Sequence, residues 1–386
     1  MKNFWKVLSY ILVAAIACTA TLLISGNWQQ IHPDSKLTQL EDLIDKYYAD
    51  HVDMDALEDA AADAMVEALP DRWSYYISAE EYAAYLEGKN NAYVGIGVTI
   101  EMTEQGYRIT KLSEGGPAEE AGLLVGDLIV AADGVSLVGM DTAQGKTHIQ
   151  GEEGTTVEIT VLREGESRTF AVERRTVRTP VATATMLDGQ IGLVKIANFN
   201  ANCSAETIAA VDALLEQGAQ ALIFDVRYNG GGYTKELVAL LDHLLPAVPV
   251  FRTVDYKGKE NVDYSDADCV EVPMAVLING SSYSAAEFFA AALAEYDAAI
   301  LVGEKTSGKG YYQVTYQLED GSAVALSTGK YFTPKGESLE GVGLTPEGEL
   351  YVTVDEKTAA AIYTGTLDPM EDPQILAAWN ALQPAA

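Results

Sequence analysis

Apolar residues follow three different periods along the 386-residue chain, and each period predicts a different structure. Residues 35–87 carry them at helical spacing, with a break at Pro70-Asp71. Residues 93–177 show short alternating stretches separated by glycine and Asp-Gly turns, which is typical of a β-rich domain. We therefore expect a helical region followed by a small β domain.

From Thr179 onward, apolar strand-like runs alternate with helical segments, which predicts a mostly parallel, buried sheet. The expected strands are Ile191–Ile196, Ala221–Val226, Met274–Ile278 and Ala299–Gly303, and the expected helices are Ala205–Leu215, Glu236–Leu245 and Ala285–Tyr296. Two more strands, Tyr312–Leu318 and Ala323–Leu326, follow around an Asp-Gly turn. The tail after Val354 reads as helical and peripheral.

The N-terminus carries a membrane signal. Lys2 and Lys6 precede an uncharged run from Val7 to Ile24, which is 24 − 7 + 1 = 18 residues. As a helix this run is about 27 Å long, which is enough to span a bilayer with the rest of the chain facing outward. We expect a retained anchor; a cleaved signal peptide and lipid attachment at Cys18 are the alternatives.

Composition narrows the classes of partner. The formal net charge of −32 excludes nucleic acid and anionic membrane surfaces as natural partners, and it fits a protein soluble outside the cell. No CxxC or Cys/His cluster occurs, so no zinc site is predicted. Cys203 and Cys269 could pair in an oxidising compartment, but nothing local forces this, so we expect two free thiols.

The segment Met274–Glu287 is the most informative for chemistry. A buried strand ends at Asn279-Gly280, three serines follow, and a helix begins near Ala285. Ser284, between a strand end and a helix N-terminus, is well placed to act as a nucleophile, because helix N–H groups favour developing negative charge beside it. The segment alone fits an ordinary N-cap serine equally well.

Two further loops follow strands of the same predicted sheet. Gly303–Gln313 holds Lys309 between two glycines. The segment does not match the phosphate-binding P-loop motif, because Gly310 occupies the position where that motif has the Ser or Thr that binds magnesium. Asp225–Tyr233 contains three glycines whose N–H groups could bind an anion. Each segment alone also fits an ordinary turn, but active sites of such sheets lie outside the carboxyl ends of the strands, so we expect one shared site.

The motifs resemble those of the carboxyl-terminal processing peptidases, a Ser-Lys protease family with an inserted PDZ domain. The family pattern N-x-x-S-x-S-A-S-E is matched by Asn279, Ser282, Ser284, Ala285 and Glu287, with Ala286 for the last serine. The pattern T-F-G-K-G-x-x-Q is matched by Thr306, Gly308, Lys309, Gly310 and Gln313, with Ser307 for phenylalanine. The family separates its nucleophile and lysine by 25 positions, and 309 − 284 = 25 here, which selects Ser284 over Ser281 and Ser282.

Two other family segments are present. The loop D-L-R-N-N-P-G-G appears as Asp225, Arg227, Asn229, Gly231 and Gly232, with Gly230 for proline. The PDZ carboxylate-binding loop is matched by Gly95, Ile96, Gly97 and Val98. The resemblance implies a crotonase-like α/β core and cleavage near the C-termini of protein substrates. It also implies that the PDZ domain captures the free carboxylate, and that the terminal helices form homodimers.

The chemistry sets a requirement on Lys309. A lysine activates a serine only when neutral, so its pKa must fall by about 3 units from about 10.4, and we expect it to be desolvated and free of Asp or Glu partners. Gln313 can orient it without adding charge, and Ala285 with Gly231 or Gly232 can donate to the oxyanion.

A histidine-based catalytic triad is the alternative within proteases. The four histidines lie in no motif-like context, so we interpret them as structural or surface residues: His32, His51, His148 and His243.

These inferences predict a five-part chain with no metal or cofactor. The parts are residues 1–30 (signal or anchor), 31–91 (helical region), 92–178 (PDZ domain), 179–352 (catalytic core) and 353–386 (helical tail). The predicted enzyme is an extracytoplasmic serine endopeptidase whose PDZ domain recognises and gates substrates. The alternative is a catalytically silent, membrane-tethered PDZ module.

Overall fold

The computed structural model describes residues 35–383, and the chain divides into two compact units, residues 1–65 and 66–386. In the first unit, α2 (Lys36–Tyr47) begins at Ser35, whose hydroxyl caps the Thr38 N–H, and none of its side chains is buried. The next helix, α3, covers Met54–Glu67. No helix among residues 35–383 is long and apolar enough to cross a membrane; the predicted anchor Val7–Ile24, with Cys18, lies outside the described residues.

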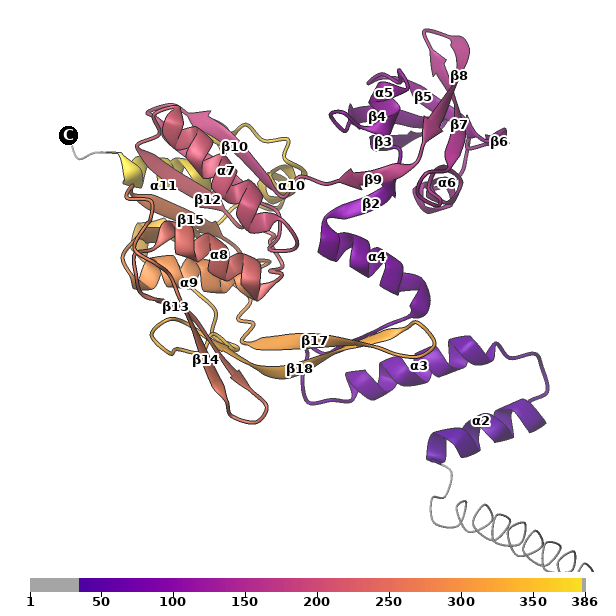
Figure 1. The fold of residues 1–386 in the computed structure, drawn as a ribbon, viewed down its shortest axis with the longest axis horizontal. Coiled ribbons are helices and arrows are strands. Elements are labelled where there is room, and N and C mark those ends of the chain that lie inside the picture. Colours follow the sequence, from indigo (N-terminus) through magenta and orange to yellow (C-terminus); the bar gives the residue numbers. More distant parts are fainter. Residues whose placement is uncertain (1–34, 384–386) are drawn as a thin grey trace, which may run out of the picture. The chain divides into compact units, whose positions relative to one another are not determined.

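The β-rich region forms a six-stranded antiparallel sheet. Its main order is β3-β4-β5-β7-β8, with β6 beside β5. The strands are β3 (Val98–Thr103), β4 (Gly106–Leu112), β5 (Leu128–Ala132), β6 (Val135–Ser136), β7 (Thr156–Arg163) and β8 (Glu166–Glu173). Two helices complete this region, α5 (Pro117–Glu120) and α6 (Thr142–Ile149), and the sequence had not indicated α6. A ribbon of β2 (Ala92–Gly95) and β9 (Arg175–Arg178) joins it to the rest of the chain (Figure 1).

The α/β core is built on a five-stranded sheet in the order β10-β11-β12-β15-β16. Its strands are β10 (Ala182–Leu187), β11 (Ile191–Ile196), β12 (Ala221–Asp225), β15 (Met274–Ile278) and β16 (Ala299–Gly303). All neighbours are parallel except β10 and β11. The predicted parallel sheet is therefore confirmed, with one unpredicted antiparallel edge.

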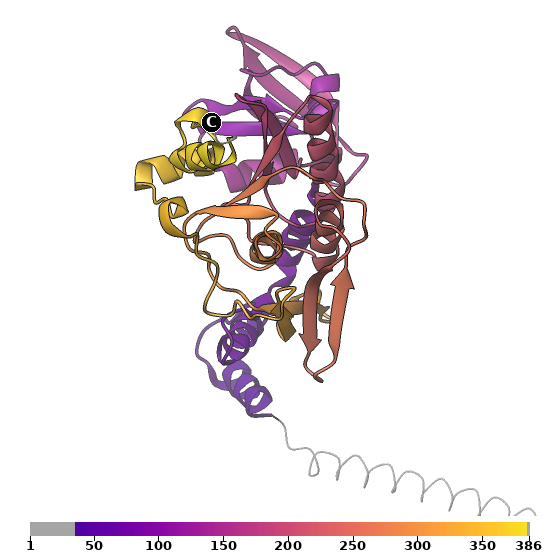
Figure 2. The same ribbon diagram turned by 90° about the vertical axis from the view of Figure 1, so that its left-hand side faces the viewer.

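Side chains on the two faces of this sheet pack against different helices. On β12, Leu222 and Phe224 face α7 (Cys203–Glu216), α8 (Thr234–Leu244) and α9 (Ala285–Glu295), whereas Ala221 and Ile223 face α11 (Pro373–Leu382). Figure 2 shows the tail helices and α7 on opposite sides of the core sheet. The tail also contains α10 (Glu356–Thr364), and its helical character is as expected. The expectation that it is peripheral is wrong, because Ile375 and Ala378 on α11 are buried against the sheet.

A second sheet lies beside the core in the order β1-β18-β13-β14, with β17 also paired to β18. Its strands are β1 (Tyr75–Ile77), β13 (Pro249–Asp255), β14 (Glu260–Tyr264), β17 (Tyr311–Gln317) and β18 (Ala323–Phe332). The helical pattern predicted up to Glu87 is wrong at β1, where pairing with β18 overrides it, and α4 (Ala79–Asn90) begins anew at the capping residue Ser78.

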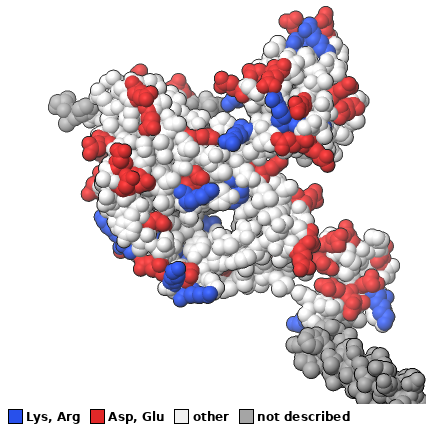
Figure 3. All heavy atoms as spheres, viewed as in Figure 1, with Lys and Arg blue, Asp and Glu red and all other residues white. Residues whose placement is uncertain are grey.

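Surface charge and cysteine state agree with the sequence. Figure 3 shows carboxylates spread over the visible face, as the net charge of −32 requires. Cys203 and Cys269 are both free thiols, and burial raises the pKa of Cys203 to about 12.

Candidate active site

Three loops meet at one edge of the core sheet. The neighbouring strands β12, β15 and β16 run parallel, so their carboxyl ends lie together. The loops that follow them carry the glycine-rich segment, Ser284 and Lys309 respectively. The structure therefore brings together the three segments that the sequence singled out.

Ser284 occupies a strained turn between β15 and α9. Its φ of 58° and ψ of −128° are unusual for a residue with a side chain, and the residue is 6% exposed. Tyr331, which is also buried, lies against it: burial raises the pKa of Tyr331, and hydrogen bonding with Ser284 opposes the rise. A strained serine between a strand and the head of a helix has the backbone geometry expected of a nucleophile.

Glu287 connects the Ser284 turn to the lysine loop. Its carboxylate accepts from the backbone N–H of Ser284 at 3.0 Å and from the backbone N–H groups of Gly308 and Lys309 at 2.8 Å each. The Thr306 hydroxyl donates to the same carboxylate. Burial raises the pKa of Glu287, and these four hydrogen bonds oppose that rise. Four converging donors require an acceptor, so Glu287 is best described as an ionised carboxylate.

The ammonium of Lys309 lies against aromatic rings. Its Nζ is 5.0 Å from the centroid of the Trp73 ring and 5.7 Å from that of Tyr283, and the two rings stack on each other at 6.3 Å. In residues 35–383, Lys309 makes no salt bridge within 4.0 Å. This is the environment that the chemistry required.

The pKa of Lys309 is lowered to about 8. Burial is the main cause, and the positive charge of Lys89 adds to it. The carboxylates of Asp71, Glu340 and Glu287 act in the opposite direction without reversing the shift. A lysine with this pKa is partly neutral near neutral pH.

A segment far upstream holds the lysine loop. Arg72 donates to the carbonyl oxygens of Ser307 and Gly308 at 3.3 and 3.5 Å, and its guanidinium lies 4.2 Å from the Trp73 ring. The Trp73 indole N–H donates to the Glu340 carboxylate at 3.2 Å. The sequence did not point to Arg72 or Trp73, since no local motif marks them.

The glycine-rich loop passes directly beside the serine. Gly231 has a φ of 81°, and a Cβ on it would lie 2.8 Å from Ser284 Cβ. Its N–H donates to Asn229 Oδ1 at 2.9 Å. For the N–H groups of Gly232 and Ala285, no acceptor is found in the described part of the chain. Two backbone donors thus remain available, one on Ala285 directly after Ser284 and one on Gly232 directly after Gly231.

A buried ion network supports this loop from below. Arg227 pairs with Asp225 at 2.7 Å and with Asp372 at 2.8 Å, and it also donates to Gln374 Oε1 at 2.8 Å. Burial alone would lower the pKa of Arg227, but the two carboxylates outweigh it and raise the pKa. The network fastens α11 to the base of the site.

Gln313, which the sequence predicted to orient Lys309, makes its hydrogen bonds to other residues. The Gln313 amide donates to the carbonyl oxygen of Tyr311 at 3.2 Å and to Ser327 Oγ at 3.0 Å. No hydrogen bond joins it to Lys309, and none joins Ser284 Oγ to Lys309 Nζ, in residues 35–383. The predicted catalytic groups share a site without being aligned.

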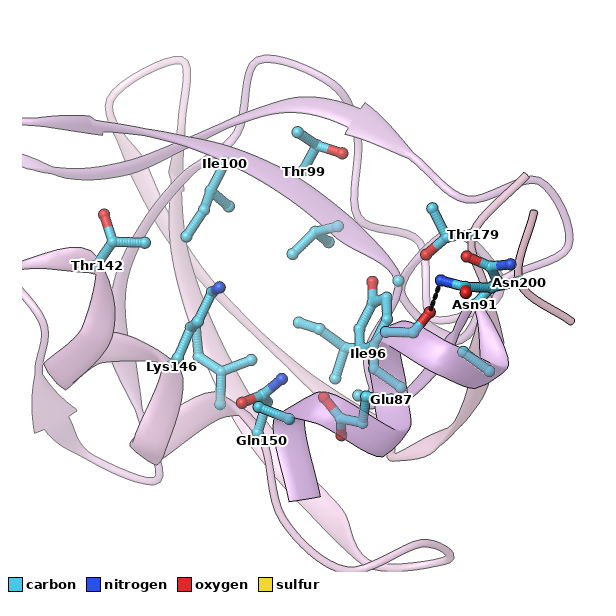
Figure 4. A pocket seen from close by; sticks show the side chains of 18 of the residues that line it. Glu87, Asn91, Ile96, Thr99, Ile100, Thr142, Lys146, Gln150, Thr179 and Asn200 are labelled. Atoms are coloured by element: carbon cyan, nitrogen blue, oxygen red, sulfur yellow. Dashed lines mark hydrogen bonds between the residues drawn. The ribbon is translucent and has the colours of Figure 1, made fainter. Parts of the chain in front are cut away.

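The predicted carboxylate loop opens into a separate groove of about 700 Å³. Gly95 ends β2, Gly97 has a φ of 76°, and Val98 begins β3, so the loop turns sharply and leaves Ile96 at its tip. Figure 4 shows the groove between β3, α6 and α4. All four predicted loop residues line it.

Known proteins match the chain over these same segments. The model of peptidase family S41 matches residues 190–350, and that of the PDZ domain matches residues 94–173. The carboxy-terminal processing protease CtpA of Bacillus subtilis (strain 168) is 31% identical over 360 residues, which cover 90% of this chain and 77% of that protein. A probable CtpA-like serine protease of Staphylococcus epidermidis (strain ATCC 12228) is 28% identical over 346 residues, 87% and 70% of the two chains.

A solved structure of a photosystem II D1 C-terminal processing protease is 27% identical, with a TM-score of 0.47 over 86% of this chain and 90% of that chain. The sequence relationships carry the assignment, because the CtpA match extends over both the PDZ and the peptidase regions. The chain belongs to the carboxyl-terminal processing proteases, the PDZ-containing serine endopeptidases of peptidase family S41.

Proposed function

We propose that this protein cleaves protein substrates near their C-termini with Ser284 as nucleophile, Lys309 as general base and Gln313 as the residue that orients the lysine. The observation that carries the proposal is the Glu287 carboxylate, which accepts from the backbone N–H groups of both Ser284 and Lys309. Two residues 25 positions apart are thereby fixed to one anchor. Such fixing supplies the positional order that nucleophilic catalysis needs.

The proposed reaction has the two steps of acyl transfer by a serine protease, and Lys309 transfers the proton in each. Neutral Lys309 takes the proton from Ser284 Oγ as that oxygen attacks the scissile carbonyl carbon. The lysine then gives this proton to the leaving amine as the peptide C–N bond breaks, which leaves an acyl group on Ser284. Water hydrolyses the ester by the same route and returns both side chains to their starting state.

We assign the oxyanion donors to backbone N–H groups. Ala285 supplies one from the first turn of α9, and either Gly231 or Gly232 supplies the other. The bond from the Gly231 N–H to Asn229 Oδ1 favours Gly232 as the second donor.

Gating by the PDZ domain forms part of the proposal. Its support is that Gln313 bonds to Ser327 rather than to Lys309, and that Lys309 rests against Trp73 rather than on Ser284. We propose that capture of a substrate C-terminus by the PDZ groove shifts the protein toward an aligned arrangement. The match to the PDZ domain supports binding of peptide C-termini, and we propose that the peptide adds as a further strand at the β3 edge.

The remaining parts of the proposal concern setting and architecture. We propose an extracytoplasmic enzyme held by residues 1–30, supported by the basic head, the uncharged run Val7–Ile24 and the net charge of −32. We also propose a crotonase-like core, because α7, α8 and α9 cover one face of a largely parallel sheet. Homodimers through the terminal helices are proposed on resemblance.

The test compares the full chain with Ser284→Ala and Lys309→Ala on an unfolded protein that has a free C-terminus. Ser281→Ala and Lys305→Ala are matched controls, because both residues are exposed and lie in the same two loops. We expect the wild type and both controls to cleave the substrate. The two site variants should fold normally but show no cleavage. Cleavage by either site variant at the wild-type rate overturns the assignment.

The arrangement of Gln313 also favours a second candidate, a catalytically silent PDZ module. If the wild type binds a saturating C-terminal peptide but still does not cleave the substrate, the second candidate is supported and the protease proposal is rejected. Binding by the wild type is therefore measured in the same experiment.

A further inference from the structure

The groove beside the PDZ carboxylate loop has one acidic and one basic side chain in its lining, and the two lie apart (Figure 4). Its walls are mostly apolar or uncharged, and among the described residues that line it only Glu87 and Lys146 are charged. Lys146 makes no salt bridge within the described chain, although the protein as a whole carries a net charge of −32. An exposed, unpaired ammonium at a binding groove is available to a ligand.

The helix α6 aims this lysine into the groove. Thr142, Lys146 and Ile149 are spaced by four and three residues, so they share one helix face, and all three line the groove. A capping box between Asp141 and Gln144 fixes the start of the helix. Figure 4 shows the Lys146 side chain reaching from α6 toward β3, near Thr142.

The opposite wall, β3, is an edge strand that can accept a ligand strand. It pairs with β4 on one side only. An extended peptide added to this edge would end at the carboxylate loop around Ile96, since the loop leads directly into β3. Val98, Ile100 and Ile149 supply apolar walls for its last side chain.

The register of such a peptide places one side chain at Lys146. Alternate residues of a strand face the same way, so the last residue and the one two before it both point into the groove, about 6.6 Å apart. Figure 4 places Gln150, which follows Ile149 at the end of α6, nearer to Ile96 than Thr142 is, and Lys146 lies about 4.5 Å back along the helix axis from Ile149. Figure 4 places Glu87 at the Ile96 end, away from Lys146.

We propose that Lys146 makes this groove select protein C-termini that carry an acidic side chain two residues before an apolar last residue. The inference rests on the proposed function of the groove as the site for substrate C-termini. The ammonium pairs with the ligand carboxylate, and the Thr142 hydroxyl offers a second donor beside it. Among the described residues that line the groove, Lys146 is the one basic side chain, so the acidic position of the ligand is the one beside Lys146.

The test is direct binding, measured by fluorescence anisotropy with the full chain carrying Ser284→Ala so that ligands stay intact. Three fluorescein-labelled hexapeptides end in valine and differ only two residues before it: glutamate, glutamine or lysine. We expect the glutamate peptide to bind about three- to fivefold more tightly than the glutamine peptide. Lys146→Gln should remove this preference, and Lys146→Glu should transfer it to the lysine peptide.

Arg168→Gln is the matched control, because it removes one positive charge from the same domain at a position outside the groove lining. It should leave the preference unchanged. A glutamate preference that persists in Lys146→Gln, or no preference in the parent chain, overturns the role of Lys146. A C-terminal amide that binds as well as the free acid overturns instead the proposed groove function, so the two failures are distinguishable.

Discussion

The Nζ atom of Lys309 lies 5.0 Å from the centroid of the Trp73 ring, although 309 − 73 = 236 positions separate the two residues. Two opposing effects meet in this contact. The ring face attracts the charged ammonium, whereas the water that the ring excludes would have stabilised that charge. Burial prevails, since the pKa of Lys309 is lowered to about 8.

Trp73→Leu and Trp73→Phe separate these two effects. Both variants lose the indole N–H bond to Glu340 and leave a smaller side chain, but only phenylalanine keeps an aromatic face. A cation–π contact of about 0.5–1 kcal/mol favours protonated lysine, so its loss lowers the pKa by about half a unit. We expect the rising limb of kcat/KM against pH to lie about half a unit lower in the leucine variant than in the phenylalanine variant. The opposite order would show that the ring acts on Lys309 only by excluding water.

Activity should rise with pH through the pKa of Lys309. The proposed general base must be neutral to act, and a pKa of about 8 leaves most of Lys309 protonated at neutral pH. We expect kcat/KM to increase about tenfold for each pH unit well below 8 and to level off above it. A profile that is flat from about pH 6 to pH 8 would exclude Lys309 as the titrating base.

Replacing the Glu287 carboxylate should cost both stability and activity. In Glu287→Gln an amide NH₂ faces N–H donors that the carboxylate accepted, including those of Ser284 and Lys309. Leaving buried donors unpaired should cost about 2–4 kcal/mol of unfolding free energy and lower kcat/KM at least about 100-fold. Urea titration and steady-state kinetics measure the two effects. Glu319→Gln, on an exposed turn, is the control and should change neither.

The chemistry-bearing loops were predictable because local sequence determines them. Ser284 follows a buried strand and precedes a helix, and Lys309 follows the next strand of the same sheet, so parallel topology alone brings the loops together. The side chains that complete the site were not predictable in this way. Trp73 reaches Lys309 only through tertiary packing, and no periodic pattern near residue 73 signals that contact.

Misreadings of the fold have the same cause. Tyr75–Ile77 lies in a helical pattern but forms a strand, because β18 offers a partner 246 or more positions away (323 − 77 = 246). Similarly, α11 has a short apolar face that resembles any surface helix until Arg227 pairs with Asp372 at its start. Long-range pairing overrode local preference at β1, and at α11 long-range packing buried a helix whose helical character the sequence had predicted.

Adding a methyl group to Gly231 should stop catalysis. Its φ of 81° disfavours any side chain, and the new Cβ would lie 2.8 Å from Ser284 Cβ. We expect Gly231→Ala to lower kcat/KM at least about 100-fold, since small displacements of a nucleophile are costly. Gly115→Ala is the control for backbone strain alone, because its φ is 60° and no atom lies within 4 Å of its Cβ position. Equal activity in both variants would contradict the close approach to Ser284.

Asp372→Asn isolates the charge that holds the tail to the site. Asparagine preserves the N-cap of α11, where Asp372 accepts from the Gln374 and Ile375 N–H groups, but it removes one carboxylate from buried Arg227. We expect a loss of about 3 kcal/mol in unfolding free energy, because an arginine buried with one carboxylate fewer is poorly compensated.

The matched control is Asp368→Asn, which alters a capping aspartate four residues earlier that is exposed and pairs with no arginine in the described chain. It should change stability by less than about 0.5 kcal/mol. Because Arg227 lies in the same loop as Gly231, kcat/KM should fall in Asp372→Asn even at temperatures where the variant is fully folded. Destabilisation with unchanged kcat/KM would show instead that the network stabilises only the tail and leaves the glycine-rich loop unaffected.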